Sequence, residues 1–356
     1  MLTVTLRRRA AVAVPVLSAV WLVFTAAHRL LSGRVYWWNL PDLLPPLAFL
    51  GVPLLLAVLG LAARRWFGVA LAVGALALGW SCNGVYASAL WHRPGPVPAD
   101  AIRVYSWNTF YWEQSPGAPP DADAFYAHLH AQRADVYLLQ EFLYLEPDWS
   151  PLPVPDNGRL RTEFPGWHVA ISGELVTVSR YPITTHREVD LRPFLERPWP
   201  DLPPADTLMP AYYTVKTLRT DLQVGGRALS VYNAHLPVPV VTLPLRDPDT
   251  ARDALARYDV RQASFRALAV DVAGNDQPIL LAGDLNTSPA MGDRRRLPPG
   301  LDDANDGLYP YSWQRFGLPL WRLDWAFGKG IEVHRCELVS PQGGSDHRGQ
   351  LITLTL

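Results

Sequence analysis

Cysteine and lysine are scarce in this 356-residue chain, which has two of each. Cys82 and Cys336 provide neither a disulfide framework nor the paired spacing of a zinc site. Lys216 and Lys329 are the only lysines, so 30 of the 32 basic residues are arginine. An exported domain of this composition would therefore be stabilised by its core alone.

Acidic residues are almost absent from the first 98 positions. This stretch holds eight arginines against Asp42 alone, a formal charge of +7, which leaves 24 basic and 32 acidic residues, a formal −8, for residues 99–356. Three apolar runs without charged residues occupy 10–27, 43–63 and 67–90. Each is close to the length that crosses a hydrocarbon core of about 30 Å. The sequence therefore predicts three transmembrane helices, followed by a soluble domain.

The arginines also predict an orientation. Arg7–Arg9 precede the first run, and Arg64 and Arg65 separate the second from the third, which favours the cytoplasm for both segments. Arg29 and Arg34 in the intervening loop count against this arrangement, and the first run alone could also be a signal peptide. We expect a multi-pass cell-membrane protein with a membrane domain at 1–92, a Pro-rich linker at 93–100 and an extracytoplasmic domain at 101–356.

The soluble part alternates apolar strands with helical patterns. Strands are predicted at 102–107, 136–140, 175–179, 212–217, 229–233, 279–282, 325–327 and 351–356, and amphipathic helices at 121–133 and 249–273. A hairpin is expected around Gly225-Gly226. This order favours an α/β fold in which two sheets pack together between helices.

Polar residues recur where these strands begin or end. An apolar strand runs into Asp284 and Asn286, which are two residues apart and therefore point the same way. The other strand ends carry Asn108, Glu141, His235, Asp324 and the run Ser345-Asp346-His347. Carboxylate and amide oxygens suit Mg²⁺, while phosphoester hydrolysis needs a positioned water and donors for the charge that develops on phosphorus. Together these residues predict a metal-assisted phosphoester hydrolase.

Each of these residues also has a structural interpretation. Asn108 could form a turn, Glu141 could be a solvated acid, and Asp324 could form a surface ion pair with Arg322. Their combination carries the prediction, since an independent coincidence of polar residues at all six strand ends or starts is improbable.

The soluble part resembles the endonuclease/exonuclease/phosphatase superfamily. The resemblance rests on motifs that occur in family order: Ser106-Trp107-Asn108, Leu139-Gln140-Glu141, Ser179-Arg180-Tyr181-Pro182-Ile183, Asn233-Ala234-His235-Leu236, Gly283-Asp284-Leu285-Asn286, Leu323-Asp324-Trp325 and Ser345-Asp346-His347. It implies a four-layer α/β sandwich of the deoxyribonuclease I-like type.

The resemblance also implies residue roles. Glu141 would ligate Mg²⁺ or Mn²⁺, with Asn108 and Asp346 near the metal. Asp284 would orient or deprotonate the attacking water, and Asn286 would contact the phosphate, to which Asn108 could also bind. His235 and His347 would contact phosphate oxygens, with Asp324 fixing the tautomer of His347. Glu174 is a looser candidate partner for His235, and Arg180 is expected to be structural.

The family does not fix the substrate. The layout resembles a membrane-anchored teicoplanin-resistance branch, which implies a lipid-linked or cell-envelope phosphate substrate. Two alternatives remain: an extracytoplasmic nuclease, made less favourable by the formal −8, and a non-catalytic envelope or resistance protein with a phosphatase-like binding domain. The apolar loop 237–248 is interpreted either as packed on the domain or as touching lipid.

Overall fold

A computed structural model describes residues 2–91, 95–112, 122–147, 150–154, 157–197, 207–240, 247–315, 317–341 and 344–356. The described chain forms two compact units. The helical unit contains Met1–Val85 together with Ser288–Arg295, which we call the returning segment, and the sheet unit contains Tyr86–Thr287 and Arg296–Leu356. The predicted domains were continuous ranges, so the returning segment was not anticipated. Half of loop 237–248, at 241–246, lies outside the described residues.

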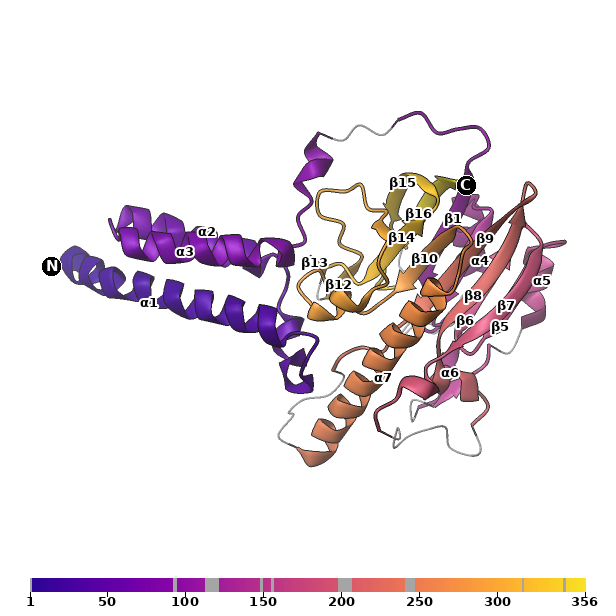
Figure 1. Cartoon of the computed structure of the whole chain (residues 1–356), viewed down its shortest axis with the longest axis horizontal. Coiled ribbons are helices and arrows are strands. Elements are labelled where there is room, and N and C mark those ends of the chain that lie inside the picture. Colours follow the sequence, from indigo (N-terminus) through magenta and orange to yellow (C-terminus); the bar gives the residue numbers. More distant parts are fainter. Residues whose placement is uncertain are drawn as a thin grey trace. The chain divides into compact units, whose positions relative to one another are not determined.

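The helical unit contains α1 (Leu2–Leu31), α2 (Ala48–Ala62) and α3 (Trp66–Gly79), with short 3-10 helices at Tyr36–Asn39, Pro41–Leu43 and Trp80–Cys82 (Figure 1). Within α1, Val12–Leu31 is long and apolar enough to cross a membrane. Tyr36–Leu43 and α2 meet this criterion only as a pair bent by 62°, and Trp66–Cys82 is shorter. Among the described residues, the prediction of three spanning helices is therefore corrected to one, or two if the bent pair counts as a span.

Helix-breaking residues explain this correction. Pro45 and Pro46 lie inside the second apolar run. Proline cannot donate a helical hydrogen bond, so α2 begins only after them, at Ala48. The third run continues through Gly84, whose φ of 74° lies in the left-handed region, and helical structure has ended before it. Apolar composition alone did not reveal these breaks.

Buried polar contacts hold the returning segment in the helical unit. The His28 Nε2 atom lies 2.8 Å from the carbonyl oxygen of Ala290. The Ser32 hydroxyl accepts a 2.6 Å hydrogen bond from the Gly292 N–H and donates one of 2.6 Å to Asp42. His28 lies in α1, Ser32 in the turn after it and Asp42 in the short helix Pro41–Leu43. The segment is thus anchored by groups that would be costly to leave unpaired.

The sheet unit contains two six-stranded mixed sheets. The first has the order β15 (Glu332–Val339), β16 (Gly349–Thr355), β1 (Ile102–Asn108), β2 (Val136–Gln140), β6 (Leu175–Ser179), β5 (His168–Ser172). The second has the order β11 (Asp302–Asp303), β14 (Asp324–Lys329), β10 (Ile279–Asp284), β9 (Arg227–His235), β8 (Val215–Val224), β7 (Ile183–Asp190). Two small ribbons pair β3 (Tyr144–Leu145) with β4 (Pro151–Leu152) and β12 (Trp313–Arg315) with β13 (Leu318–Trp321).

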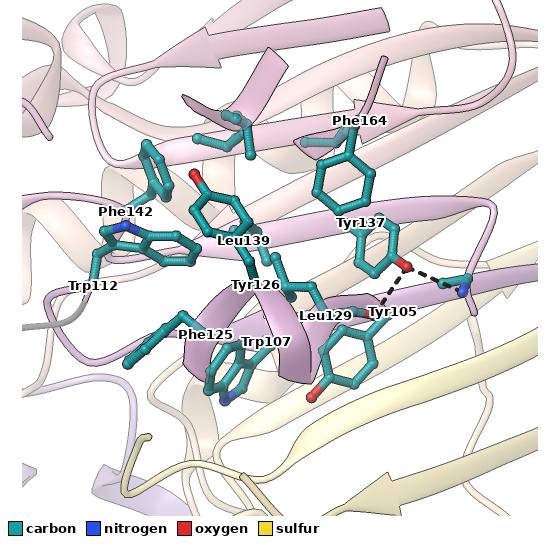
Figure 2. Close-up of a cluster of buried hydrophobic side chains, with 14 of the residues drawn as sticks. Tyr105, Trp107, Trp112, Phe125, Tyr126, Leu129, Tyr137, Leu139, Phe142 and Phe164 are labelled. Atoms are coloured by element: carbon teal, nitrogen blue, oxygen red, sulfur yellow. Dashed lines mark hydrogen bonds between the residues drawn. The ribbon is translucent and has the colours of Figure 1, made fainter. Parts of the chain in front are cut away.

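Three buried clusters show how these sheets and helices are layered. Helix α4 (Ala122–Gln132) packs Phe125 and Leu129 on the outer face of the first sheet, where the Tyr137 hydroxyl donates a 3.0 Å hydrogen bond to the Leu129 carbonyl (Figure 2). Helix α7 (Pro248–Ala273) covers the outer face of the second sheet. Apolar side chains such as Val104 and Val231 fill the space between the sheets. The predicted α/β fold, with sheets packed between helices, is confirmed.

Most predicted elements appear within a few residues of their expected bounds. The hairpin of β8 and β9 turns at Gly225-Gly226, both with positive φ, as two-residue hairpin turns favour. The predicted start of the strand at 212–217 is wrong. Pro210–Thr214 forms the short helix α6, and β8 begins at Val215. Proline at a first helical position favours such a turn. Helix α5 (Asn157–Glu163), β5, β7 and β15 were not predicted.

An amide pair joins the two sheets. The Gln140 side-chain N–H of β2 donates a 2.6 Å hydrogen bond to the Asn233 side-chain oxygen of β9. The Asn233 N–H₂ donates to the carbonyls of Leu139 (2.9 Å) and Val176 (3.0 Å). Both amide side chains are fully buried. Apolar contacts are non-directional and do not by themselves fix the position of one sheet relative to the other. These directional hydrogen bonds therefore fix that relative position.

We predict that Asn233→Leu lowers the free energy of unfolding by about 3 kcal/mol, since two buried carbonyls and an amide lose their partner. Urea unfolding of the purified full-length protein would measure this loss. Asn305→Ala is the matched control, because the hydrogen bonds of Asn305 stay within its own turn. An equal, small effect of both substitutions would contradict the bridging role.

Candidate active site

Strand register brings the polar strand ends together. In the second sheet, Asp284 at the end of β10 is paired with His235 at the end of β9 on one side and with Asp324 at the start of β14 on the other. In the first sheet, Asn108 at the end of β1 pairs with Gln140, directly before Glu141. The two sheets thus present their polar ends to one another.

Asp284 lies at the centre of this site. Its Oδ2 atom accepts hydrogen bonds from the side-chain amides of Asn108 (3.0 Å) and Asn286 (3.1 Å). The same oxygen lies 3.8 Å from the His235 Nε2 atom and 3.7 Å from that of His347. Asp284 is 1% exposed. Burial, the largest effect, raises its pKa, with Asp324 adding to the rise.

His347 is held by Asp324. The Asp324 Oδ2 atom lies 2.8 Å from His347 Nδ1, and both residues are buried. Burial opposes protonation of the imidazole, but Asp324 and Asp284 outweigh it and raise the pKa of His347 to about 10. The alternative in which Asp324 forms a surface ion pair with Arg322 is wrong, because Arg322 pairs with Asp303 at 2.6 Å.

A second carboxylate–imidazole pair holds His235. Its Nδ1 atom lies 3.0 Å from the Glu174 Oε2 atom. Glu174 is in turn bound by the Lys216 ammonium group, 2.8 Å from Oε1. Burial favours neutral Glu174, but His235 and Lys216 outweigh it and lower the pKa of Glu174 to about 2. Burial likewise opposes the protonation of His235, whose pKa Glu174, Glu141 and Asp284 raise to about 9.

Glu141 and Asp346 have oxygens suited to a cation. The Glu141 Oε1 atom accepts a 3.0 Å hydrogen bond from Asn108, whereas its buried Oε2 atom has no hydrogen-bond partner among the described residues. Asp346 accepts at Oδ2 from the Trp313 indole (2.7 Å), and its buried Oδ1 atom has no described hydrogen-bond partner but lies 3.8 Å from His347 Nε2. Burial raises the pKa of Glu141 to about 7, although His235 opposes this shift. Such oxygens fit a hard divalent ion.

A second set of groups could also hold a metal. Asp284, Asp324 and His347 each offer one ligand atom within 4.8 Å of the others. The His347 Nδ1 atom of this set is already engaged by Asp324, as in a carboxylate–histidine pair. Glu141 and Asp346 stay the predicted metal ligands, and Asp284, Asp324 and His347 are the alternative set.

Asn108 and Asn286 orient the carboxylates. Asn108 donates to Glu141 and Asp284, and its side-chain oxygen accepts from the Phe110 N–H at 3.0 Å. Asn286 donates to Asp284 and to the Leu236 carbonyl, and its amide nitrogen lies 3.4 Å from His235 Nε2. All eight predicted site residues are thus connected, while their chemical roles stay predictions. Arg180 pairs with Asp135 at 3.1 Å, in agreement with its expected structural role.

Two backbone features mark the site. Glu141 and Asn286 have φ values of 53° and 46°, in the left-handed region that residues other than glycine rarely adopt. Gly283 has a φ of 142°, and a Cβ there would lie 2.0 Å from the Ala234 carbonyl oxygen. The glycine therefore permits the close approach of β9 and β10 that sets His235 beside Asp284.

Sequence reasoning missed Lys216 and two tyrosines. Lys216 is 6% exposed and also lies over the Tyr212 ring, 4.4 Å from its centroid. Burial raises the pKa values of Tyr111 and Tyr212, and the negative charges of Glu141 and Glu174 raise both further. A lysine inside an apolar strand, in a chain with only two lysines, was the available signal.

The family model described as "Endonuclease/Exonuclease/phosphatase family" matches residues 105–347. This chain belongs to that family. A comparison with curated proteins finds no match. None of these findings links the chain to antibiotic resistance, which stays a prediction.

Several solved structures are similar to this chain at low identity. An endonuclease/exonuclease/phosphatase from Beutenbergia cavernae is 18% identical, covers 72% of each chain and has a TM-score of 0.49. The human Nocturnin catalytic domain with bound sulfate is 14% identical over 73% of this chain and 96% of its own, with a TM-score of 0.48. Sphingomyelinase C from Streptomyces griseocarneus is 18% identical over 71% of this chain and 99% of its own, with a TM-score of 0.43.

Family members hydrolyse phosphoesters and typically use divalent metals, so the predicted reaction class is supported at that level. The metal, the substrate and the membrane attachment are not decided by family membership.

The raised histidine pKa values predict a pH-dependent stability. The folded-state pKa values of His347 and His235, about 10 and about 9, exceed the unfolded value of about 6.5. Their contribution is therefore fully present below about pH 6.5 and is lost as pH rises through the folded values, at up to about 1.4 kcal/mol per pH unit for each histidine.

Urea unfolding with a chelator present, between about pH 7 and about pH 10, would measure this slope. His347→Gln should flatten it, whereas His130→Gln, at a largely exposed histidine on α4, should keep it. Equal slopes in wild type and His347→Gln would contradict the assignment.

Proposed function

We propose that this protein is a membrane-anchored, divalent-metal-dependent phosphoester hydrolase that acts outside the cytoplasm on a lipid-linked or cell-envelope phosphate. One observation carries the catalytic part of the proposal: two histidines, each held by its own carboxylate, present Nε2 atoms 3.7 and 3.8 Å from one oxygen of Asp284. Two cationic donors around a general base are the groups that water attack on a phosphoester requires.

The histidines would bind the phosphoryl oxygens. With pKa values raised to about 10 and about 9, His347 and His235 are cations at neutral pH and can donate from Nε2. Asp324 and Glu174 fix the opposite ring nitrogens, so the donors are oriented before substrate arrives. The charge that develops on the phosphoryl oxygens in the transition state would be stabilised by groups that need no reorganisation.

Asp284 would orient the attacking water and accept its proton. Burial raises the pKa of Asp284, which makes it a better base than a solvated aspartate. The amides of Asn108 and Asn286 hold the Asp284 Oδ2 atom from two directions, leaving little rotational freedom. Asn286 would then also contact the phosphate. No covalent intermediate on the protein is needed.

Glu141 and Asp346 would hold the metal, with Mg²⁺ as the ion that best suits carboxylate oxygens and Mn²⁺ as the alternative. A bound cation would neutralise negative charge on the phosphoryl group. The orphaned oxygens Oε2 of Glu141 and Oδ1 of Asp346 support this assignment.

The surface of α1 supports membrane attachment. Val12, Val16, Val20 and Val23 follow one another at helical spacing, and each is more than half exposed. Such a face is costly in water but stable in lipid. Three arginines precede the apolar stretch of α1 and two follow it, which favours a cytoplasmic N-terminus. A single crossing by α1 would then place the following chain outside the cytoplasm.

A lipid-linked substrate follows from attachment and charge. A hydrolase fixed in a bilayer meets membrane-bound phosphates at high local concentration. Residues 99–356 have a formal charge of −8, which disfavours the polyanionic surface of DNA or RNA. A nuclease is therefore the weaker alternative, and the complete set of catalytic groups weighs against a domain that only binds.

We predict that the detergent-solubilised full-length protein, supplied with Mg²⁺, releases phosphate-containing product from a polyprenyl pyrophosphate. His347→Ala and Asp284→Ala should each reduce turnover at least about a thousandfold, since they remove a donor and the base. The panel would also contain a phospholipid, a sphingolipid, and single- and double-stranded DNA.

His130→Ala is the matched control, because this histidine pairs with Glu163 on the outer side of α4. It should retain wild-type turnover. Full activity of either active-site variant would disprove the site, and turnover of DNA alone would favour the nuclease. Folded protein that binds Mg²⁺ but turns over no phosphoester would favour a binding domain.

We further predict that Glu141→Gln weakens Mg²⁺ binding by at least about tenfold, because a charged ligand becomes neutral while its shape is kept. Calorimetric titration of metal into the apo protein measures this without any turnover. Glu163→Gln serves as the control on a surface ion pair. Unchanged affinity in Glu141→Gln would move the metal to the Asp284, Asp324 and His347 set.

A further inference from the structure

Arginines gather at one end of the helical unit. Arg29, near the C-terminal end of α1, donates from Nη1 to the Leu78 carbonyl (3.1 Å) and to the Ser81 hydroxyl (2.8 Å). These two acceptors lie at the C-terminal end of α3 and in the short helix that follows it. Arg29 therefore joins the C-terminal ends of α1 and α3.

The returning segment brings another arginine to the same place. The Arg295 Nη2 atom donates a 2.6 Å hydrogen bond to the Ser32 carbonyl. At Gly33, a Cβ would lie 2.6 Å from the Asp293 backbone nitrogen, so the segment passes directly beside the turn that carries Arg34. Burial lowers the pKa of Arg295, and electrostatic repulsion from Arg34 and Arg29 lowers it further.

No exposed acid balances these charges in the described part of the helical unit. Asp42 and Asp293 are its acidic residues, and each is 1% exposed. Asp42 accepts the Ser32 hydroxyl hydrogen bond and faces inward. By contrast, Arg29, Arg34 and Arg295 are exposed. The Arg34 backbone N–H donates to the Leu31 carbonyl, whereas its guanidinium group makes no hydrogen bond or ion pair with another described residue. The surface is thus strongly cationic.

Apolar side chains accompany the arginines. Leu30 is next to Arg29 in α1 and is 61% exposed, and Trp37 follows Arg34 at 50% exposure. Trp80 is next to Ser81, the partner of Arg29, and is 52% exposed. Tryptophan and arginine side chains together are typical of the membrane–water interface, where indoles sit at headgroup level and guanidinium groups reach lipid phosphates.

We propose that Arg29, Arg34 and Arg295 form a binding site for the phosphate of an anionic membrane lipid. A ligand for this surface must be negatively charged to pair with three guanidinium groups and apolar to contact Leu30, Trp37 and Trp80. A lipid meets both requirements, whereas a free phosphate ion meets only the first. The inference rests on the proposed membrane attachment but not on hydrolysis.

The returning segment gives this site a structural role. Arg295 reaches it from a segment that begins two residues after Asn286. A lipid phosphate would relieve the repulsion among the arginines, and it would therefore stabilise the fold of the returning segment against α1. Neutral lipids would not provide this stabilisation.

The test is the midpoint of thermal unfolding of the full-length protein in a neutral detergent, titrated with phosphatidylglycerol, phosphatidylcholine or inorganic phosphate. We expect wild type to be stabilised by phosphatidylglycerol with roughly a hundredfold preference over phosphatidylcholine, and Arg34→Gln to reduce that preference about fivefold. Arg34 is chosen first because its side chain makes no described hydrogen bond or ion pair whose loss would destabilise the fold. The triple variant with Arg29→Gln and Arg295→Gln should lose the preference.

Arg64→Gln with Arg65→Gln is the matched control, because these arginines lie at the opposite end of α3, about 20 Å from Ser81. It should keep the preference. If the triple variant does not fold, high salt must abolish the wild-type preference, since the binding is electrostatic. Equal stabilisation by both lipids, or full stabilisation by inorganic phosphate, would overturn the inference. Wild type that stays soluble without detergent would overturn membrane attachment and the lipid site together, leaving the hydrolase proposal standing.

Discussion

The hydrogen bond between the Gln140 and Asn233 side chains is the constraint on which the site depends. Gln140 directly precedes Glu141 in the first sheet, and Asn233 stands two residues before His235 in the second. Apolar packing between the sheets would tolerate a sliding of one against the other. The amide pair does not, because a slip would leave its buried donors and acceptors unpaired. Glu141 and His235, which come from different sheets, are thereby kept at one distance, 3.6 Å between Oε1 and Nε2.

The charges of the site are balanced in pairs rather than by solvent. Asp324 faces His347, and Glu174 lies between His235 and Lys216, so each buried carboxylate has a buried cation. A buried ion pair adds little stability and is costly to break, which makes it a means of fixing geometry. Glu141 and Asp346 are less closely paired, since their oxygens lie 3.6 and 3.8 Å from the histidine Nε2 atoms and each retains a buried oxygen without a described hydrogen-bond partner. That imbalance is what a divalent cation would correct.

The sequence was enough to predict that these residues lie close together, because they sit at strand ends. Once the apolar runs are placed as neighbouring strands, Asp284, His235 and Asp324 fall on one edge without further information. Lys216 was missed because its partner Glu174 is far away in sequence and its strand was expected to begin at 212. The lengths of the apolar helices were overestimated for another reason. Hydropathy depends only on which residues a run contains, whereas Pro45, Pro46 and Gly84 limit the helices through the backbone conformations that they allow.

The returning segment lay beyond sequence reasoning because its membership depends on three-dimensional contacts. Ser288–Arg295 reads as an ordinary loop, and its arginines look like a solvated basic strip. The contacts of Ala290, Gly292 and Arg295 with His28 and Ser32 instead make it part of the helical unit. The chain therefore passes from Asn286, a predicted site residue, into the helical unit within two residues. The helical unit is thus not formed by the N-terminal residues alone, because His28 and Ser32 would lose buried partners without the returning segment.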